Sequence, residues 1–347
     1  MLSFFPAPYP DELWYSVLSR YFAYSGYFAK CRNNSVNRDL LGNRMRRYVP
    51  FYGTNLNNFL TQLPNNFITA DEIILQHTLY PYYARFFDAS RKENALQTML
   101  GEGKQHSSLM LLMGNEQTKT KHDKYLRYCT FCSQEDMEQY GETYWHRIHQ
   151  IDDLRICPKH NVFLNNSHFL TISSKKLCPP IYEIEEADTT SVSPEELNFA
   201  KLSMDVLNAP IDSFTHCVRD VFGYALLRKG YVKPNGRKTA LTRLYSDFCE
   251  FKEKTDTGKG ALGGIDSVMD ISNILCGKRA MGATLFLASF LDMNVHDIVF
   301  HPSESLRQRW DREFVELLLA GETENDIALK FGMSKKDIRV NRKRLNQ

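Results

Sequence analysis

The chain has 347 residues, of which 43% are hydrophobic and 24% charged, and its formal net charge is +2. This composition is typical of a soluble globular protein with two or three small domains. The eight cysteines are neither dense nor evenly patterned, which excludes a disulfide scaffold, and the longest apolar stretches are too short to span a bilayer. No apolar run follows a basic start, so we expect a cytoplasmic, reducing environment in which paired cysteines favour metal over disulfides.

The first 118 residues are expected to form a helical domain, because apolar residues recur at helical spacing from Leu2 to about Asp88. Asp11 is positioned to cap a helix through "ELWYSVLSRYFAYSG", which Gly26 would end. Further helices are predicted over residues 35–41, 55–62, 70–78 and 92–100. The stretch "SSLMLLMG" fits either a strand or a buried turn, and its periodicity does not decide between them.

Residues 119–180 contain scattered aromatics, cysteines and prolines but no long periodic run, which is typical of a small module held by a metal. Within them lie a C-x2-C pair and, after 24 intervening residues, a C-x2-H pair, formed by Cys129, Cys132, Cys157 and His160. Two ligands three residues apart can wrap one ion in a tight turn, and two such pairs supply the four N and S ligands of tetrahedral Zn²⁺. A complete shell leaves no position for water, so we predict a structural zinc that helps to fold a module with little core of its own.

Two alternatives to this metal set stay open. The four residues could be unrelated buried thiols and a surface histidine, although two matched pairs argue against that interpretation. Three nearby histidines, His122, His146 and His149, could replace one ligand. Their spacing forms no second pair, and we expect them to pack or to bind phosphate instead. The other cysteines in helical patterns are expected to belong to the core.

Residues 181–300 are expected to form a second helical domain that binds DNA. An acidic linker over 181–192 precedes a helix that Ser193 caps and Pro194 begins. Helices are predicted over 213–228, 239–254, 266–275 and 282–291, with a flexible break at "TDTGKGALGG". A basic run crosses this domain without an acid between Val221 and Ser246, and it contains Arg228, Lys229, Lys233, Arg237, Lys238 and Arg243. Lys233, Arg237, Lys238 and Arg243 surround a turn before a helix and are suited to backbone phosphates, unless the run is merely a solvated loop.

Residues 301–347 have the pattern of a helix-turn-helix unit. Helices are predicted over 311–320 and 324–331, Gly332 supplies the turn, and Ser334 caps a third helix. From Lys330 to Gln347 there are seven Lys or Arg residues and one acid, a net charge of +6. A basic third helix is suited to the major groove, where its side chains reach base edges and phosphates. The candidates for DNA contact are Lys335, Lys336, Arg339, Arg342, Lys343 and Asn341, the last being the only neutral amide well inside the helix. The alternative is a solvated terminal helix.

Two smaller basic islands could touch phosphate or an acidic partner. One contains Arg44, Arg46 and Arg47, and the other contains Lys119, Lys121, Lys124 and Arg127. Basic islands spread along a near-neutral chain indicate an extended track for a polyanion, with acidic faces left for protein partners.

Nothing in the sequence points to catalysis. It contains no G-x-x-x-x-G-K-[ST], G-x-S-x-G or H-E-x-x-H motif. An acid triad for a Mg²⁺-dependent nuclease remains an open alternative on spacing alone, although no three carboxylates stand out in a strand and helix context. We therefore expect a protein that is not an enzyme. The expected fold class is mainly α, with helix-turn-helix domains and an inserted small zinc-binding module.

The chain resembles the TniQ/TnsD family, the target-site selectors of TnsABCD-type bacterial transposons, and most closely its TnsD branch. The resemblance is carried by "FFPAPYPDELWYSVLSRY", "ILQHTLYPYYARFF", "LRYCTFCSQEDMEQYGETYWHR" and "RICPKHNVFL", and more weakly by "ISNILCGKRAMGATLFLASFL". It implies that Cys129, Cys132, Cys157 and His160 match the zinc ligands of the family. Many TniQ proteins carry a second cysteine cluster, of which Cys178 alone remains here, and TnsD chains are longer.

The resemblance also implies a function and partners. It implies a non-catalytic, nucleoid-associated protein that binds an attachment site in double-stranded DNA and recruits TnsC, an AAA+ ATPase that engages the transposase subunits. Related TniQ proteins instead join a CRISPR RNA-guided effector complex to the transposition machinery. Both possibilities stay open on the sequence.

Overall fold

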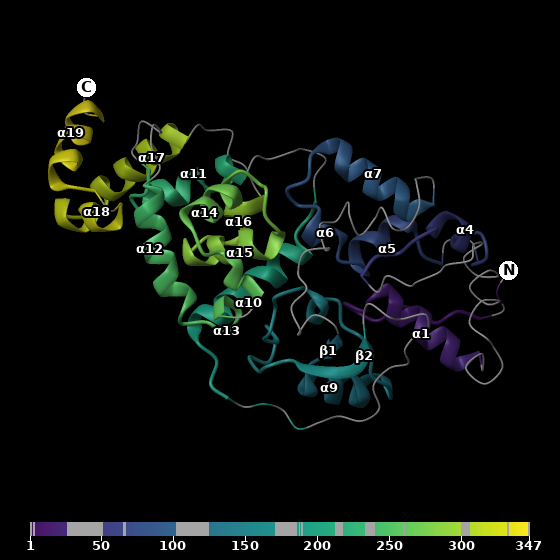
Figure 1. The fold of residues 1–347 in the computed structure, drawn as a ribbon. Helices are drawn as coiled ribbons and strands as arrows, with labels where there is room; N and C mark the ends of the chain where they lie inside the picture. Colours follow the sequence, from purple (N-terminus) through teal and green to yellow (C-terminus); the bar gives the residue numbers. More distant parts are fainter. Residues whose placement is uncertain are drawn as a thin grey trace.

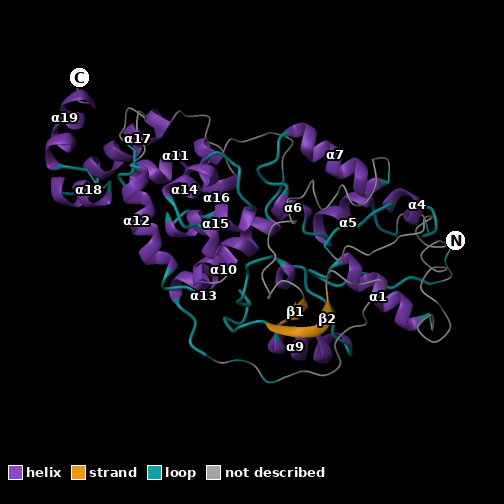
Figure 2. Cartoon of the chain, viewed as in Figure 1, coloured by secondary structure: helices purple, strands orange, loops and turns teal. Residues whose placement is uncertain are grey.

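The computed structural model describes residues 2, 4–25, 51–64, 67–101, 125–170, 186, 188, 190–211, 218–232, 240–259, 261–299, 306–331 and 333–345. Within these ranges the chain is mainly helical, as predicted, and a single pair of strands forms its sheet (Figures 1 and 2). The predicted helix over 35–41, the "SSLMLLMG" stretch, His122 and Cys178 lie outside the described residues.

The elements follow one another in four groups. The first group contains α1 (Trp14–Tyr24), α4 (Leu56–Leu60), α5 (Ala70–Gln76), α6 (Tyr80–Tyr83) and α7 (Ala89–Leu100). The second contains β1 (Tyr125–Tyr128), α9 (Thr130–Tyr140), the 3₁₀ turn η1 (Ile148–Gln150) and β2 (Asn165–Leu170). The third contains α10 (Pro194–Asn208), α11 (Val218–Arg228), α12 (Leu241–Lys252), α13 (Asp256–Lys259), η2 (Ala261–Gly264), α14 (Val268–Leu275), α15 (Met281–Phe290) and α16 (Val295–Val299). The last contains α17 (Leu306–Leu319), α18 (Glu324–Lys330) and α19 (Lys335–Leu345).

Helix α1 begins later than the sequence predicted. Asp11 does not cap it: its φ is +56°, and its carboxylate accepts hydrogen bonds from the Arg147 side chain and the Ile148 backbone N–H. The helix therefore starts at Trp14 without a side-chain cap. Residues 11–13 run beside residues 145–147, where Leu13 N donates to the Trp145 carbonyl at 2.9 Å and Arg147 N donates to the Asp11 carbonyl at 2.7 Å. This pairing joins the first helix to the predicted metal module.

Strands β1 and β2 pair antiparallel, with Tyr128 opposite Asn165, and lie next to α9 (Figure 2). The apolar residues of this segment do not form a core of their own. Leu126, Trp145 and Ile156 are buried in one continuous core that runs from Phe5 to Ile298. Only a small cluster around the cysteines stands apart, with Phe131, Val162 and Leu164 packed against it. The second group is thus fused to the rest of the fold through apolar packing, while the cysteines form a small buried cluster of their own.

The third group of helices continues the same core. Ser193 caps α10 as predicted, by accepting a hydrogen bond from Glu196 N. The expected flexible break at "TDTGKGALGG" is wrong, because this stretch forms α13 and η2, and Thr257 there is buried and donates to the Glu196 carboxylate. Helix α15 is buried on all sides. Even so, no helix within the described ranges has the length and apolar content needed to cross a bilayer.

Helices α17, α18 and α19 form a lobe at the end of the molecule opposite the N terminus (Figure 1). Gly321 ends α17 in the left-handed region, with φ of +78°, where a side chain would strain the backbone. The lobe has its own core, made of Trp310, Phe314, Ile327, Ala328, Phe331 and Ile338. Tyr224 and Leu227 of α11 complete this core, so the lobe is docked on the body of the protein through α17 and α11.

Candidate metal centre and nucleic-acid interface

Two short backbone features position the four candidate metal ligands. Cys129 is the residue before α9, and Cys132 lies in the first turn of that helix. Cys157 and His160 lie in a tight loop that Asn161 closes in the left-handed region, with φ of +58°. Asn161 N donates to the Cys157 carbonyl at 2.8 Å, and Cys157 N donates to the Val162 carbonyl at 2.8 Å. Each pair therefore directs two side chains to one point.

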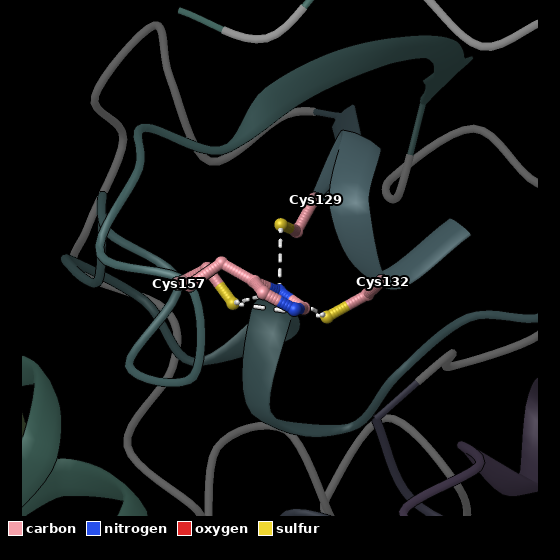
Figure 3. A group of neighbouring side chains, drawn as sticks. Cys129, Cys132 and Cys157 are labelled. Atoms are coloured by element: carbon pink, nitrogen blue, oxygen red, sulfur yellow. Dashed lines mark hydrogen bonds between the residues drawn. The ribbon is translucent and has the colours of Figure 1, made fainter. Parts of the chain in front are cut away.

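The ligand atoms have the spacing of a tetrahedral zinc shell. All four lie within 4.8 Å of one another, and the three sulfur atoms turn toward one another in Figure 3. The Cys132 and Cys157 sulfurs are 3.8 Å apart, and His160 Nδ1 lies 3.3 Å from the Cys132 sulfur and 3.5 Å from that of Cys129. Zn–S and Zn–N bonds of about 2.3 and 2.0 Å at tetrahedral angles require S–S and S–N separations of about 3.8 and 3.5 Å. The arrangement thus fits Zn²⁺, and the identity of the ion remains a prediction.

The chemistry of the buried thiols also favours a cation. The three cysteines are buried, and hydrogen bonds with the other two thiols lower the pKa of Cys129. Hydrogen bonds with Cys129 and Cys157 raise the pKa of Cys132. Three adjacent sulfurs cannot all be ionised in this environment without a positive charge between them. A divalent ion would supply that charge, and a shell of three Cys and one His would leave no open coordination position.

Side chains around the ligands hold them in place. Glu135 was not predicted among them, whereas His146 and His149 were expected to pack or to bind phosphate. His160 Nε2 lies 3.1 Å from a Glu135 carboxylate oxygen, which orients the ring so that Nδ1 faces the sulfurs. The ring of His149 is buried, and its Nε2 lies 3.8 Å from the Cys132 sulfur. Burial lowers the pKa of His149 well below its usual range, which favours the neutral imidazole. His149 therefore packs beside the cluster, while His146 pairs with Asp136 at 2.8 Å.

A buried ion network connects α1 to the loop after α9. The Arg20 guanidinium lies 2.9 Å from Glu12 and 2.9 Å from Glu142, and it stacks 3.7 Å above the Tyr9 ring. Ser16 donates to Glu12 at 2.8 Å. Burial raises the pKa of Glu12 to about 7, while the Arg20 charge and these hydrogen bonds act against that rise. The recurrence of Glu12, Ser16 and Arg20 every four residues was the available signal, because this spacing brings them to one side of the segment, although Glu12 itself lies before the start of α1.

Arg127 is turned into the protein and does not belong to a phosphate-binding island. It is buried, and its guanidinium donates to the Leu154 and Ile151 carbonyls, both at 2.5 Å. These bonds satisfy the backbone after η1, so Arg127 has a structural role. The other members of the two small islands, Arg44, Arg46, Arg47, Lys119, Lys121 and Lys124, lie outside the described residues.

The described part of the basic run over 228–243 is held by neighbouring groups. Arg228 donates to the carbonyls of Leu291 and Asp292 at the end of α15, and Lys229 pairs with the Asp292 carboxylate. Arg243 lies over the Tyr231 ring at 4.9 Å and 3.6 Å from Asp247. Lys233, Arg237 and Lys238 lie outside the described residues. Arg243 remains exposed, and its contact with phosphate stays a prediction.

Helix α19 presents two kinds of cation. Arg339 and Arg342 face Glu324 of α18, with N–O distances of 2.9 and 3.8 Å, and Arg344 pairs with Asp311 of α17. Lys335, Lys336 and Lys343 are exposed, and no carboxylate of the described residues forms an ion pair with them. Helix α19 therefore carries three lysine ammonium groups without an ion pair to a described carboxylate, and two arginines that share Glu324 as their partner.

Asn341 differs from its predicted placement. Only 9% of its surface is exposed, and its amide donates to the Asp337 carbonyl at 2.9 Å. The reason is the helical period, which puts Asn341 on the same face as the buried Ile338. A buried amide that bonds to its own helix is not available to a base edge, so we exclude Asn341 from the candidate DNA contacts.

The comparisons with known proteins concern the first half of the chain. Residues 3–164 match the TniQ family model. The chain is 29% identical over 161 residues to the transposon Tn7 transposition protein TnsD of Escherichia coli. The aligned residues make up 46% of this chain and 31% of that protein. The chain thus covers less than a third of the length of this relative. The four candidate ligands lie within the matched residues, and α17, α18 and α19 lie outside the family match.

Proposed function

Because the chain belongs to the TniQ/TnsD family through residues 3–164, we propose that it acts in DNA transposition as a target-site selector. It binds an attachment site in double-stranded DNA through α19 and recruits a TnsC-type AAA+ ATPase, which then engages the transposase. It performs no chemistry itself. The single observation that carries this proposal is the family match, and the relative's printed name assigns that protein to transposition.

The metal centre supports a shape-holding role in this proposal. A shell of three cysteines and one histidine has no position for a reacting water, so bound zinc would brace the turn between α9 and the 157–160 loop. In addition, the closed shell argues against a nuclease centred on this metal. Zinc here would fix the end of the second group of elements.

The lobe of α17, α18 and α19 supports the DNA-binding part. A short helix, a turn and a basic third helix form the arrangement that places a recognition helix in the major groove. Lys336 and Lys343 are exposed without an acidic partner among the described side chains. Ammonium groups there neutralise phosphates and release counterions, which gives an affinity that depends steeply on salt.

The test replaces these two charges. For Lys336→Gln with Lys343→Gln, we expect the slope of log affinity against log salt to become shallower by about 2, since each phosphate contact contributes roughly 0.9. Binding to duplexes selected from a random pool by the unchanged protein is measured by fluorescence anisotropy between low and physiological salt. The matched control is Lys201→Gln with Lys278→Gln, two exposed lysines of α10 and the loop after α14. An unchanged slope in the first variant contradicts DNA contact through α19.

Glu324 is expected to limit the DNA affinity of α19. Its carboxylate faces Arg339 and Arg342 and competes with phosphate for both guanidinium groups. In Glu324→Gln, we expect affinity for the selected duplex to rise about fivefold at low salt, since an exposed charge pair contributes up to roughly 1 kcal/mol. Titration of the same duplex measures the change. Glu322→Gln, an exposed acid two residues earlier, is the control, and equal affinities for both variants would contradict this competition.

A second candidate function has one observation in its favour. Five cations of the described basic segments, Arg228, Lys229, Arg339, Arg342 and Arg344, are engaged by groups of the chain itself. Such neutralisation suits an adaptor that contacts little DNA directly and joins a CRISPR RNA-guided effector complex to the transposition machinery. Co-purification with a guide-loaded effector, combined with weak binding to every naked duplex, would favour the adaptor. Retained, sequence-selective binding to naked DNA favours the target-site selector.

A further inference from the structure

The exposed surface of α19 is almost entirely charged. Eight of its residues are exposed, at positions 335, 336, 337, 339, 340, 342, 343 and 344, and seven of these are Lys, Arg or Asp. Val340 is the exception, with 59% of its surface exposed. Val340 is also a β-branched residue of only moderate helix propensity, so the helix itself gives no reason for its presence there.

Helical geometry places Val340 on the outward face, beside its centre. The buried face of α19 is formed by Ile338 and Asn341, with Leu345 partly buried beside them. At about 100° per residue, the direction opposite that face falls on Lys336 and Lys343. Val340 lies about 40° around the helix axis from Lys336 and one turn further along it. The exposed isopropyl group of Val340 therefore lies beside two ammonium groups that form no ion pair with a described carboxylate.

Lys336 and Lys343 lie on the same outward face of α19. Their positions differ by seven residues, which corresponds to about 10 Å along the helix axis. With the helix in the major groove, this face is turned toward the DNA, where the long lysine side chains reach phosphates and the short side chain of Val340 faces the base edges. Charge complementarity thus identifies the occupant of this face as double-stranded DNA.

We propose that Val340 contacts the C5 methyl group of a thymine in the major groove and so determines part of the sequence specificity of this helix. The inference rests on the proposed DNA-binding function. The isopropyl group has no donor or acceptor, and the thymine methyl is the apolar group that a base pair presents in that groove. Asn341, the one amide on the helix, is buried and cannot supply the alternative hydrogen-bonded readout. A lysine can contact a phosphate on any sequence, whereas Val340 distinguishes thymine from cytosine.

The experiment removes one methyl group at a time. A duplex selected by the unchanged protein is remade with deoxyuridine in place of each thymine in turn, and affinities are measured by anisotropy at one fixed salt concentration. We expect one or two positions at which the loss of the methyl weakens binding by about three- to tenfold. Val340→Ala should bind the thymine duplex more weakly by a similar factor and should show no further loss with deoxyuridine. Restoring the methyl on 5-methylcytosine at that position should recover part of the affinity of the unchanged protein.

Controls separate this inference from the proposed function. Val340→Ala changes no charge, so its salt slope and thermal stability should equal those of the unchanged protein. Val315→Ala, an exposed valine on α17 of the same lobe, should keep full sensitivity to deoxyuridine. Binding that is insensitive to deoxyuridine at every position, or sensitivity that survives in Val340→Ala, would overturn the inference while leaving DNA binding intact. Failure of the unchanged protein to bind any duplex would overturn both.

Discussion

Cys132→Ser is expected to lose its metal and to destabilise the whole protein. Zinc bound by a closed thiolate shell contributes folding free energy directly, about 10 to 16 kcal/mol in small zinc-finger peptides, whereas a domain is stable by only about 5 to 15 kcal/mol. Because Trp145 and Ile156 connect this segment to the continuous core, the loss should spread beyond residues 125–170. Elemental analysis should fall from about one zinc per chain to near zero, and thermal unfolding should move to a markedly lower temperature.

The matched control for this prediction is Cys276→Ser. Cys276 was expected in the core, but it is exposed, lies outside the cysteine cluster and follows α14. Its replacement should therefore leave both zinc content and melting temperature unchanged. Hydrogen exchange should locate the effect, because amides of α9 and of the 157–160 loop should lose protection first in Cys132→Ser. Full zinc content in Cys132→Ser, or no zinc in unchanged protein purified under reducing conditions, would contradict the assignment.

The cluster of candidate metal ligands could be predicted from the sequence because its determinants are local. Each pair of ligands lies three residues apart, and a turn of fixed length brings both side chains to one ion whatever the rest of the fold does. Helix caps are local in the same sense. Ser193 and Ser334 were predicted to cap α10 and α19, and each accepts a hydrogen bond from the N–H three residues later. Such features depend on a few consecutive residues and not on tertiary packing.

Polar residues whose partners lie far along the chain were placed wrongly or missed. Asp11 looked like a helix cap, yet its carboxylate bonds to residues 147 and 148. Arg127 looked like part of a basic island, yet its partners are carbonyls more than twenty residues away. A prediction from composition counts every charged side chain as exposed. In the folded protein some of these side chains are buried, because they form hydrogen bonds with buried backbone groups. The burial of Asn341, in contrast, could have been predicted from the sequence. Asn341 lies three residues after Ile338 and four before Leu345, and this helical spacing puts all three on the inward face.

The network around Arg20 shows why such residues matter for stability. Glu12 is buried, and Ser16 connects it to the backbone of Trp145. The Ser16 hydroxyl accepts a hydrogen bond from Trp145 N at 3.0 Å. A charge in this place is tolerated only because the guanidinium of Arg20 bonds both Glu12 and Glu142. The pair therefore fixes the orientation of α1 relative to the loop after α9, and neither carboxylate has an equivalent partner if Arg20 is lost.

Arg20→Met is accordingly expected to lower the free energy of unfolding by about 3 to 5 kcal/mol near neutral pH, because it leaves buried acids without a counter-charge. Folding already raises the pKa of Glu12 from 4.5 to about 7. A raised carboxyl pKa contributes stability that is present below 4.5 and lost as pH rises through about 7, and removal of Arg20 raises this pKa further. The deficit of the variant should therefore be smaller at pH 5 than at pH 8.

Urea denaturation at the two pH values measures this difference, with Arg219→Met as the control. Arg219 is exposed on α11, so its replacement should cost less than about 0.5 kcal/mol at either pH. The methionine in Arg20→Met retains most of the apolar length of the arginine, which limits the loss of packing and isolates the charge. A deficit that is equal at pH 5 and pH 8 would mean that the cost arises from packing against Tyr9, and the electrostatic account of this network would then be wrong.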